Sequence, residues 1–289
     1  MSYFVTFYSY KGGVGRTLTL VNVAVCLAQA GRSVFLWELD LEAPGILEIP
    51  FFGSLRESAK GGTVDLLADA FEQDPSIRLP DLILDHPDFG GRIRLLPAGR
   101  PGSGYSEKFS AIPWDRLFAA GSTTGSVFFD RMRQTIENLN CDFVLIDSRT
   151  GLTDIGAICT VQLADLVVLV YNLGHQNAAG TAGVQIALTG LKHQRQIRFK
   201  EPEILRVACQ VPFEWPDLVQ ERRKALLDTG SLVRAGRRKR AAAEEFNLTP
   251  HVEIPLNSSL LAEETVWAHS FPEDQTLTRA YKDLAKRIL

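Results

Sequence analysis

A glycine-rich segment near the N-terminus restricts the possible folds of this chain more than any other feature. It follows a short apolar run at residues 3–8 and precedes a segment of helical periodicity at residues 17–30. The segment reads Lys11, Gly12, Gly13, Val14, Gly15, Arg16, Thr17. Glycines in such a loop accept positive φ and allow close backbone approach, so that successive N–H groups point at phosphate oxygens beside the positive end of a helix dipole. The pattern predicts a phosphate-binding loop between a strand and a helix.

Two residues of this loop depart from the usual G-x-x-x-x-G-K-[ST] pattern. Tyr10 stands where the first glycine belongs, and Arg16 stands where the lysine belongs. Arginine keeps the positive charge and forks onto phosphate oxygens, but it is bulkier than lysine at a crowded phosphate. We therefore expect the loop to bind a triphosphate, with Arg16 slowing its hydrolysis. We also expect the hydroxyl of Thr17 to contact a magnesium ion.

The rest of the chain alternates short apolar runs with longer amphipathic segments. Strands are predicted at residues 3–8, 33–38, 92–96, 143–147, 166–171, 204–211 and 251–254, and helices at residues 17–30, 64–71, 128–139, 179–191 and 218–227. Several of the strands are apolar throughout, as central strands covered on both faces are. The sequence predicts an α/β fold with a doubly wound, mostly parallel sheet and helices on both faces, in a single domain spanning residues 1–289. Ligands bind such sheets at the carboxyl ends of the strands.

Composition excludes several classes of protein. The 289 residues are 45% hydrophobic, and 31 basic against 34 acidic residues give a net charge of −3, which excludes a disordered chain and a wholly basic nucleic-acid binder. The four cysteines are far apart in apolar neighbourhoods, which predicts reduced core residues. No window holds about 18 uninterrupted apolar residues, and the N-terminus lacks the features of a signal peptide. We expect a cytoplasmic protein.

Two acidic segments follow predicted strands. Glu38 and Asp40 come at the end of the second predicted strand, and Asp147 ends the run at residues 143–147, with Gly151 four residues later. A carboxylate at a strand end can hold magnesium through water, and a glycine N–H can donate to a γ-phosphate. These positions predict a metal and phosphate site next to the glycine-rich loop.

The sequence K-G-G-x-G, followed by a basic residue and threonine, resembles the deviant Walker A loop of the ParA/MinD class of P-loop ATPases. The resemblance implies that Lys11 reaches across a dimer interface to the partner's nucleotide. It also implies that Asp40 belongs to a first switch, where it orients the attacking water or the magnesium shell, and that Asp147 and Gly151 belong to a Walker B strand and a second switch. ATP and Mg²⁺ are the expected cofactors, because the N-K-x-D signature of guanine recognition is absent from the sequence.

Recognition of the base is less clearly encoded. In the ParA/MinD class an asparagine that contacts adenine often follows the strand predicted here at residues 204–211, but this chain has Gln210 at that point. The amide of Gln210 is one candidate contact, and backbone groups with stacking are the alternative. Arg149 also has two open interpretations: it contacts a phosphate or the opposite subunit, or it braces a surface loop by pairing with Asp154.

Two segments of the C-terminal half suggest interactions. One is a basic run made of Arg234, Arg237, Arg238, Lys239 and Arg240. By resemblance to ParA-like proteins it would bind DNA without sequence preference, whereas a short charge run with neighbouring glutamates is also typical of a solvated surface. The other segment, residues 277–289, has an apolar stripe at helical spacing. MinD-like proteins place such a helix on membranes, but the stripe lacks large aromatic residues and favours packing on the sheet.

The leading functional hypothesis is an ATP-dependent switch between monomer and homodimer, with slow hydrolysis and an unidentified protein partner. The alternative is a nucleotide-sensing interaction module without turnover. A bacterial tyrosine-kinase-like enzyme is a further alternative. Those enzymes usually carry a tyrosine cluster at the C-terminus, and here only Tyr281 lies near the end.

Overall fold

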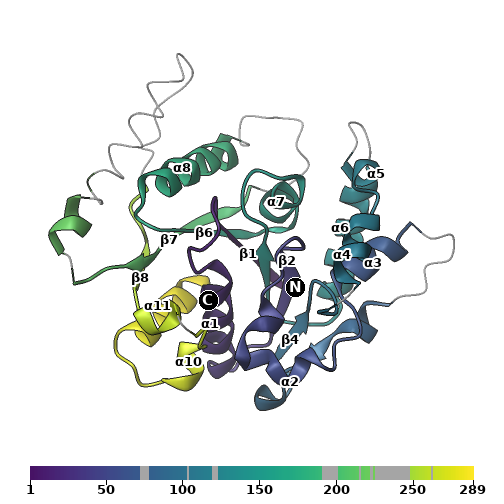
Figure 1. The fold of residues 1–289 in the computed structure, drawn as a ribbon, viewed down its shortest axis with the longest axis horizontal. Coiled ribbons are helices and arrows are strands. Elements are labelled where there is room, and N and C mark those ends of the chain that lie inside the picture. The colour runs from purple at the N-terminus through teal and green to yellow at the C-terminus, as the bar shows by residue number, and fades with distance from the viewer. Residues whose placement is uncertain are drawn as a thin grey trace.

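A computed structural model describes residues 1–71, 78–102, 104–118, 123–190, 201–214, 216–221, 224, 248–261 and 263–289. Its centre is an eight-stranded sheet with the order β3-β4-β2-β5-β1-β6-β7-β8 (Figure 1). The strands are β1 (Tyr3–Tyr8), β2 (Val34–Leu39), β3 (Leu84–Asp85), β4 (Ile93–Leu96), β5 (Phe143–Ser148), β6 (Leu166–Tyr171), β7 (Glu203–Val211) and β8 (Val252–Pro255). Every neighbouring pair is parallel except β3 with β4. The prediction of a mostly parallel, doubly wound sheet is confirmed.

Helices cover both faces of the sheet, because successive residues of the strands point to opposite sides. Val5 and Phe7 of β1 pack with α1, whereas Phe4 packs in a second cluster with Phe129 of α6. The first face carries α1 (Arg16–Gln29), α10 (Trp267–Ser270) and α11 (Leu277–Ile288), near α2 (Gly53–Arg56). Other α-helices with described bounds are α3 (Thr63–Asp69), α4 (Tyr105–Ala111), α5 (Trp114–Phe118), α6 (Thr124–Glu137), α7 (Asp154–Ala157) and α8 (His175–Thr189).

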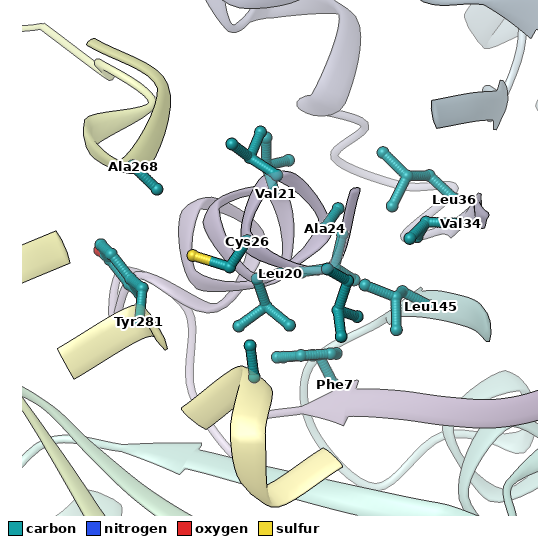
Figure 2. Close-up of a cluster of buried hydrophobic side chains, with 14 of the residues drawn as sticks. Phe7, Leu20, Val21, Ala24, Cys26, Val34, Leu36, Leu145, Ala268 and Tyr281 are labelled. Carbon is teal, nitrogen blue, oxygen red and sulfur yellow. The ribbon is translucent and has the colours of Figure 1, made fainter. Parts of the chain in front are cut away.

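Helix α1 is the centre of the larger hydrophobic cluster (Figure 2). Leu20 and Ala24 of α1 are fully buried and face the sheet, where Phe7 lies. Tyr281 of α11 packs on another side of α1. Tyr281, Leu284 and Ile288 of α11 are each less than 5% exposed. The terminal apolar stripe therefore packs inside the protein, which confirms that interpretation over membrane attachment.

The predicted elements agree with the structure except at their ends, but the short helices α2, α4, α5, α7 and α10 and one edge strand were not predicted. β3 was not predicted, because a two-residue strand carries too little pattern to recognise. α6 and α8 each begin four residues before the predicted start, since their first turns hold few apolar residues. For the predicted helix at residues 218–227, helical backbone is described at residues 216–221 and 224, and the remainder lies outside the described residues.

Three further expectations concern the cysteines, membrane-spanning helices and the basic run. All four cysteines are buried and unpaired, as expected for reduced core residues. In the described part of the chain, no helix has both the length and the apolar character needed to cross a bilayer. The basic run at residues 234–240 lies outside the described residues, so DNA binding through it stays a prediction.

A buried asparagine joins α1 to α10 and gives a test of this packing. Asn22 is fully buried; its Oδ1 accepts from the backbone N–H of Ala268 at 2.8 Å, and its Nδ2 donates to the carbonyl of Leu18 at 2.8 Å. Asn22→Ala leaves the Ala268 N–H buried without a partner, so we expect the free energy of unfolding to fall by about 2 kcal/mol.

Urea denaturation followed by circular dichroism measures this loss. The matched control is Gln29→Ala, because Gln29 donates to the carbonyl of the same Ala268 at 3.3 Å but is itself exposed. The control is expected to change stability by less than about 0.5 kcal/mol. Equal losses in both variants would show that burial of the Asn22 hydrogen bonds is not what matters.

Candidate functional site

The glycine-rich loop connects β1 to α1 in a conformation that requires glycine at two positions. Gly13 has φ 74° and Gly15 has φ 82°, both in the left-handed region, and a Cβ at either position would meet nothing within 4 Å. The requirement is therefore backbone conformation and not space. Gly15 has no side chain to cap the helix that begins at Arg16, so the first N–H groups of α1 face the loop as donors for an anion.

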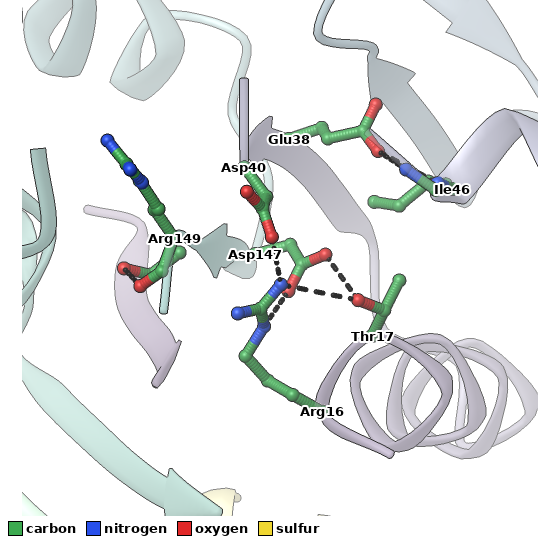
Figure 3. Close-up of polar contacts among 9 residues, drawn as sticks. Arg16, Thr17, Glu38, Asp40, Ile46, Asp147 and Arg149 are labelled. Carbon is green, nitrogen blue, oxygen red and sulfur yellow. Dashed lines mark hydrogen bonds and ion pairs between the residues drawn. The ribbon is translucent and has the colours of Figure 1, made fainter. Parts of the chain in front are cut away.

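The two predicted carboxylates meet behind this loop because β2 and β5 are parallel neighbours. Glu38 of β2 is in register with Asp147 of β5, so Asp40 lies just beyond the end of the pairing, on the same edge of the sheet. The hydroxyl of Thr17 donates to Oδ2 of Asp147 at 2.7 Å. The structure thus brings together Thr17, Asp40 and Asp147, the three residues predicted to hold magnesium (Figure 3).

Arg16 points into this carboxylate pair. Its Nε donates to Oδ1 of Asp147 at 2.6 Å, and its Nη2 donates to Oδ2 of Asp40 at 2.8 Å (Figure 3). Arg16 is only 7% exposed and Asp147 only 1%. Burial alone would lower the pKa of Arg16, but the two carboxylates outweigh it and raise that pKa above its ordinary value. The guanidinium therefore stays charged and neutralises part of a buried acidic pair.

Glu38, the first acid of the predicted switch, has a structural role. Its Oε1 accepts from the N–H groups of Gly45 and Ile46 at 2.7 and 2.8 Å, and its Oε2 accepts from Ala98 N–H at 2.9 Å. Burial raises the pKa of Glu38 to about 7, against the effect of these three donors. One side chain thus fixes the loop after β2 to the loop after β4.

The second predicted switch lies against the first. Gly151, with φ 79°, donates its N–H to the carbonyl of Ser9 at 3.4 Å, which places it beside the start of the glycine-rich loop. Arg149 pairs through Nη2 with Oε2 of Glu42 at 2.5 Å. The proposed pairing of Arg149 with Asp154 is therefore wrong, because the loop after β2 brings Glu42 to Arg149.

Lys11 and its neighbour Tyr10 contact α8 and not the carboxylate pair. Lys11 is exposed, and its Nζ donates to Oε1 of Gln176. The ring of Tyr10 covers Gly180, where an added Cβ would fall 2.0 Å from Tyr10 Cδ1. Lys11 is thus directed away from the protein's own phosphate loop, and its contact with a partner's nucleotide stays a prediction.

A pocket of about 750 Å³ opens over the loop. Its lining contains the predicted residues Gly12, Gly13, Val14, Gly15, Arg16, Thr17, Asp40 and Gln210. Gln210, with φ 57°, donates from Nε2 to the carbonyl of Gly13 at 2.9 Å, so its amide braces the loop. The far wall includes Pro255, Leu256 and Asn257, which sequence reasoning missed. The available signal was the predicted strand at residues 251–254, because ligands gather where parallel strands end.

The sheet order, the loop between β1 and α1, and the carboxylates at the ends of β2 and β5 define a P-loop nucleoside triphosphatase fold. Among solved structures the chain resembles a chain of the MinC:MinD cell division protein complex of Aquifex aeolicus, with a TM-score of 0.65 and 18% identity over 99% of this chain and 96% of that one. It also resembles MinD with Mg-ADP from Pyrococcus horikoshii, with a TM-score of 0.63 and 19% identity over 100% and 96% of the two chains. A ParA family ATPase of Chlorobium tepidum gives a TM-score of 0.58 and 17% identity over 99% of both chains. The chain has the fold of the MinD and ParA proteins.

Similarity to curated proteins in sequence extends over a shorter part of the chain than similarity in structure. No protein-family model matches the chain. The septum site-determining protein MinD of Synechocystis sp. is 32% identical over 88 residues, which are 29% of this chain and 32% of that protein. The match thus spans about a third of the relative's length.

Proposed function

We propose that this protein binds ATP with magnesium in the pocket over the glycine-rich loop and uses the nucleotide to control its association with a second copy. The observation that carries the proposal is the convergence of Thr17, Asp40 and Asp147 directly behind the N-terminus of α1. The structural resemblance to MinD with Mg-ADP supports it.

The oxygen donors fit magnesium. One hydroxyl and two carboxylates are hard ligands of the kind that Mg²⁺ prefers, and Mg²⁺ usually takes one or two carboxylates together with phosphate oxygens and water. Among the described residues, no group of three or more His, Cys, Asp or Glu side chains is arranged to hold a metal. The chain therefore offers magnesium a partial shell that the nucleotide would complete. The ion supplies charge neutralisation on the phosphates.

The chain's own groups would divide the remaining work. Backbone N–H groups of residues 12–17 donate to the phosphates, and Arg16 adds a positive charge beside them. Asp40, which lines the pocket, orients the attacking water. Lys11 contacts the phosphates of the partner in a dimer, and loss of the γ-phosphate removes the contacts that order the two switch loops. We propose slow hydrolysis, with a nucleotide sensor without turnover as the alternative.

Calorimetric titration of Mg-ATP tests binding, and a pair of matched variants tests the location of the site. Gly15 and Gly31 both have φ 82° and both have open space where a Cβ would be added. Alanine at either position therefore carries a similar backbone strain of about 1 kcal/mol. Gly15→Ala deforms the phosphate cradle and is expected to weaken ATP binding by about tenfold or more.

Gly31→Ala, at the other end of α1, is expected to leave ATP affinity unchanged. Equal affinity in the two variants would move the site away from this loop. A binding signal in the calorimeter with Mg-GTP but not with Mg-ATP would reverse the assignment of the base. A binding signal with neither nucleotide would contradict the proposal. Single-turnover hydrolysis then separates the slow ATPase from the sensor.

A further inference from the structure

The pairing of Arg16 with the carboxylates places a cation of the chain where magnesium would be held. Nε and Nη2 each donate to one carboxylate, and Thr17 donates to the second oxygen of Asp147. Both oxygens of Asp147 are therefore engaged by groups of α1. A magnesium ion, or the water through which it is held, needs the same oxygens.

One donor of the guanidinium is left over. Nη1 of Arg16 is buried and has no hydrogen-bond partner among the described residues. Leaving such a group unpaired is costly, so a buried donor of this kind favours the arrival of an acceptor. Arg16 lines the pocket over the loop. An incoming phosphate oxygen is the acceptor that this position suits, because arginine matches phosphate geometry.

We propose that Arg16 is an internal counter-cation that excludes magnesium from Asp40 and Asp147. When a nucleoside triphosphate binds, its phosphates give the guanidinium another anion to pair with, and the carboxylates become available to the metal. This inference rests on the proposed function, because it describes how the same site is regulated. Metal binding is then coupled to nucleotide binding: each increases the affinity of the other. A lysine at position 16 would be a weaker block, because a single ammonium does not fork onto two carboxylates as a guanidinium does.

The inference makes a prediction that needs no nucleotide. Arg16→Ala leaves two buried carboxylates without their counter-charge, which makes them a site for a divalent cation. We expect MgCl₂ or MnCl₂ alone to raise the melting temperature of this variant by about 3 °C at ten times the dissociation constant. The parent protein, whose carboxylates are already paired, is expected to show no such rise at the same concentration and constant ionic strength.

The matched control is Arg149→Ala, which removes another arginine–carboxylate pair at the pocket, but a partly exposed one. It is expected to behave as the parent does. Arg16→Gln, which keeps much of the stem and has no charge, is a second variant in case Arg16→Ala does not fold, and metal-dependent folding of either variant supports the inference. Metal stabilisation of the parent alone, or no stabilisation of either folded Arg16 variant, would overturn it.

Because this test contains only the metal, its result is independent of whether ATP binds. Failure of the Mg-ATP titration would remove the proposed function, whereas failure of the metal test would remove only the counter-cation. A final measurement tests the coupling of metal and nucleotide binding. Electron paramagnetic resonance gives the factor by which ATP raises the Mn²⁺ affinity of each protein, and this factor is expected to be at least ten times larger for the parent than for Arg16→Ala. Equal increases in the two proteins would contradict the coupling.

Discussion

Arg16→Lys is expected to raise ATP turnover by about a hundredfold, which corresponds to about 2.7 kcal/mol in activation free energy. The guanidinium has to leave Asp40 and Asp147 before it can pair with the phosphates, and it is bulkier at a crowded phosphate than a lysine ammonium. A lysine ammonium is compact and settles between the β- and γ-phosphates. The transition state tolerates less misplacement than the ground state, so the rate should change much more than the affinity.

Single-turnover hydrolysis and calorimetric titration of the same two proteins measure both quantities. ATP affinity is expected to change by less than about threefold, because the backbone N–H groups of the loop supply much of the binding. Slower hydrolysis by Arg16→Lys would mean that arginine is an adapted catalytic residue here. If neither protein hydrolyses ATP under any partner condition, the sensor without turnover is the better description.

Lys11→Ala is expected to abolish ATP-dependent dimerisation, whereas Asp40→Ala is expected to accumulate the dimer. Lys11 is exposed and directed toward Gln176 on α8, outside the pocket lining of its own subunit, so its proposed contact is with a partner. Asp40 lies inside the pocket and is proposed to position water, so its loss should block hydrolysis and not assembly.

Light scattering in ATP and in ADP distinguishes these outcomes. Gln176→Ala is a useful control, since it removes the contact that holds Lys11 against α8 while leaving the lysine in place, and it is expected to dimerise at least as well as the parent. Equal dimerisation by Lys11→Ala and Asp40→Ala would contradict the roles assigned to both residues.

The fold was largely predictable because its central strands are short apolar runs separated by helical segments. Residues 166–171 are apolar throughout, and they form β6 with the predicted bounds. β3 was missed because a two-residue edge strand depends on its antiparallel pairing with β4 and not on its own pattern. Helix starts were displaced for a similar reason, since polar first turns have no apolar periodicity.

The sequence indicated that the predicted site residues would gather at one edge of the sheet, but it did not indicate how they pair. The positions of Asp40 and Asp147 after apolar strands indicated their chemistry, yet their common ion pairs with Arg16 follow from the adjacency of β2 and β5 in the sheet. Of the two interpretations of Arg149, the pairing with Asp154 was wrong for the same reason: Asp154 is near in sequence, but Glu42 is near in space. Contacts between loops that follow different strands depend on strand order, which local sequence does not encode.

The packing of Tyr10 on Gly180 has a consequence for the variation of this sequence among relatives. A phenol ring stands where the usual loop pattern has glycine, and α8 accommodates it only by lacking a side chain at position 180. The two positions should therefore vary together: chains with an aromatic residue at the first should keep glycine at the second, and chains with glycine at the first should tolerate larger residues at the second. Covariation between these positions would mark a lineage in which α8 and the phosphate loop have evolved as one packed unit.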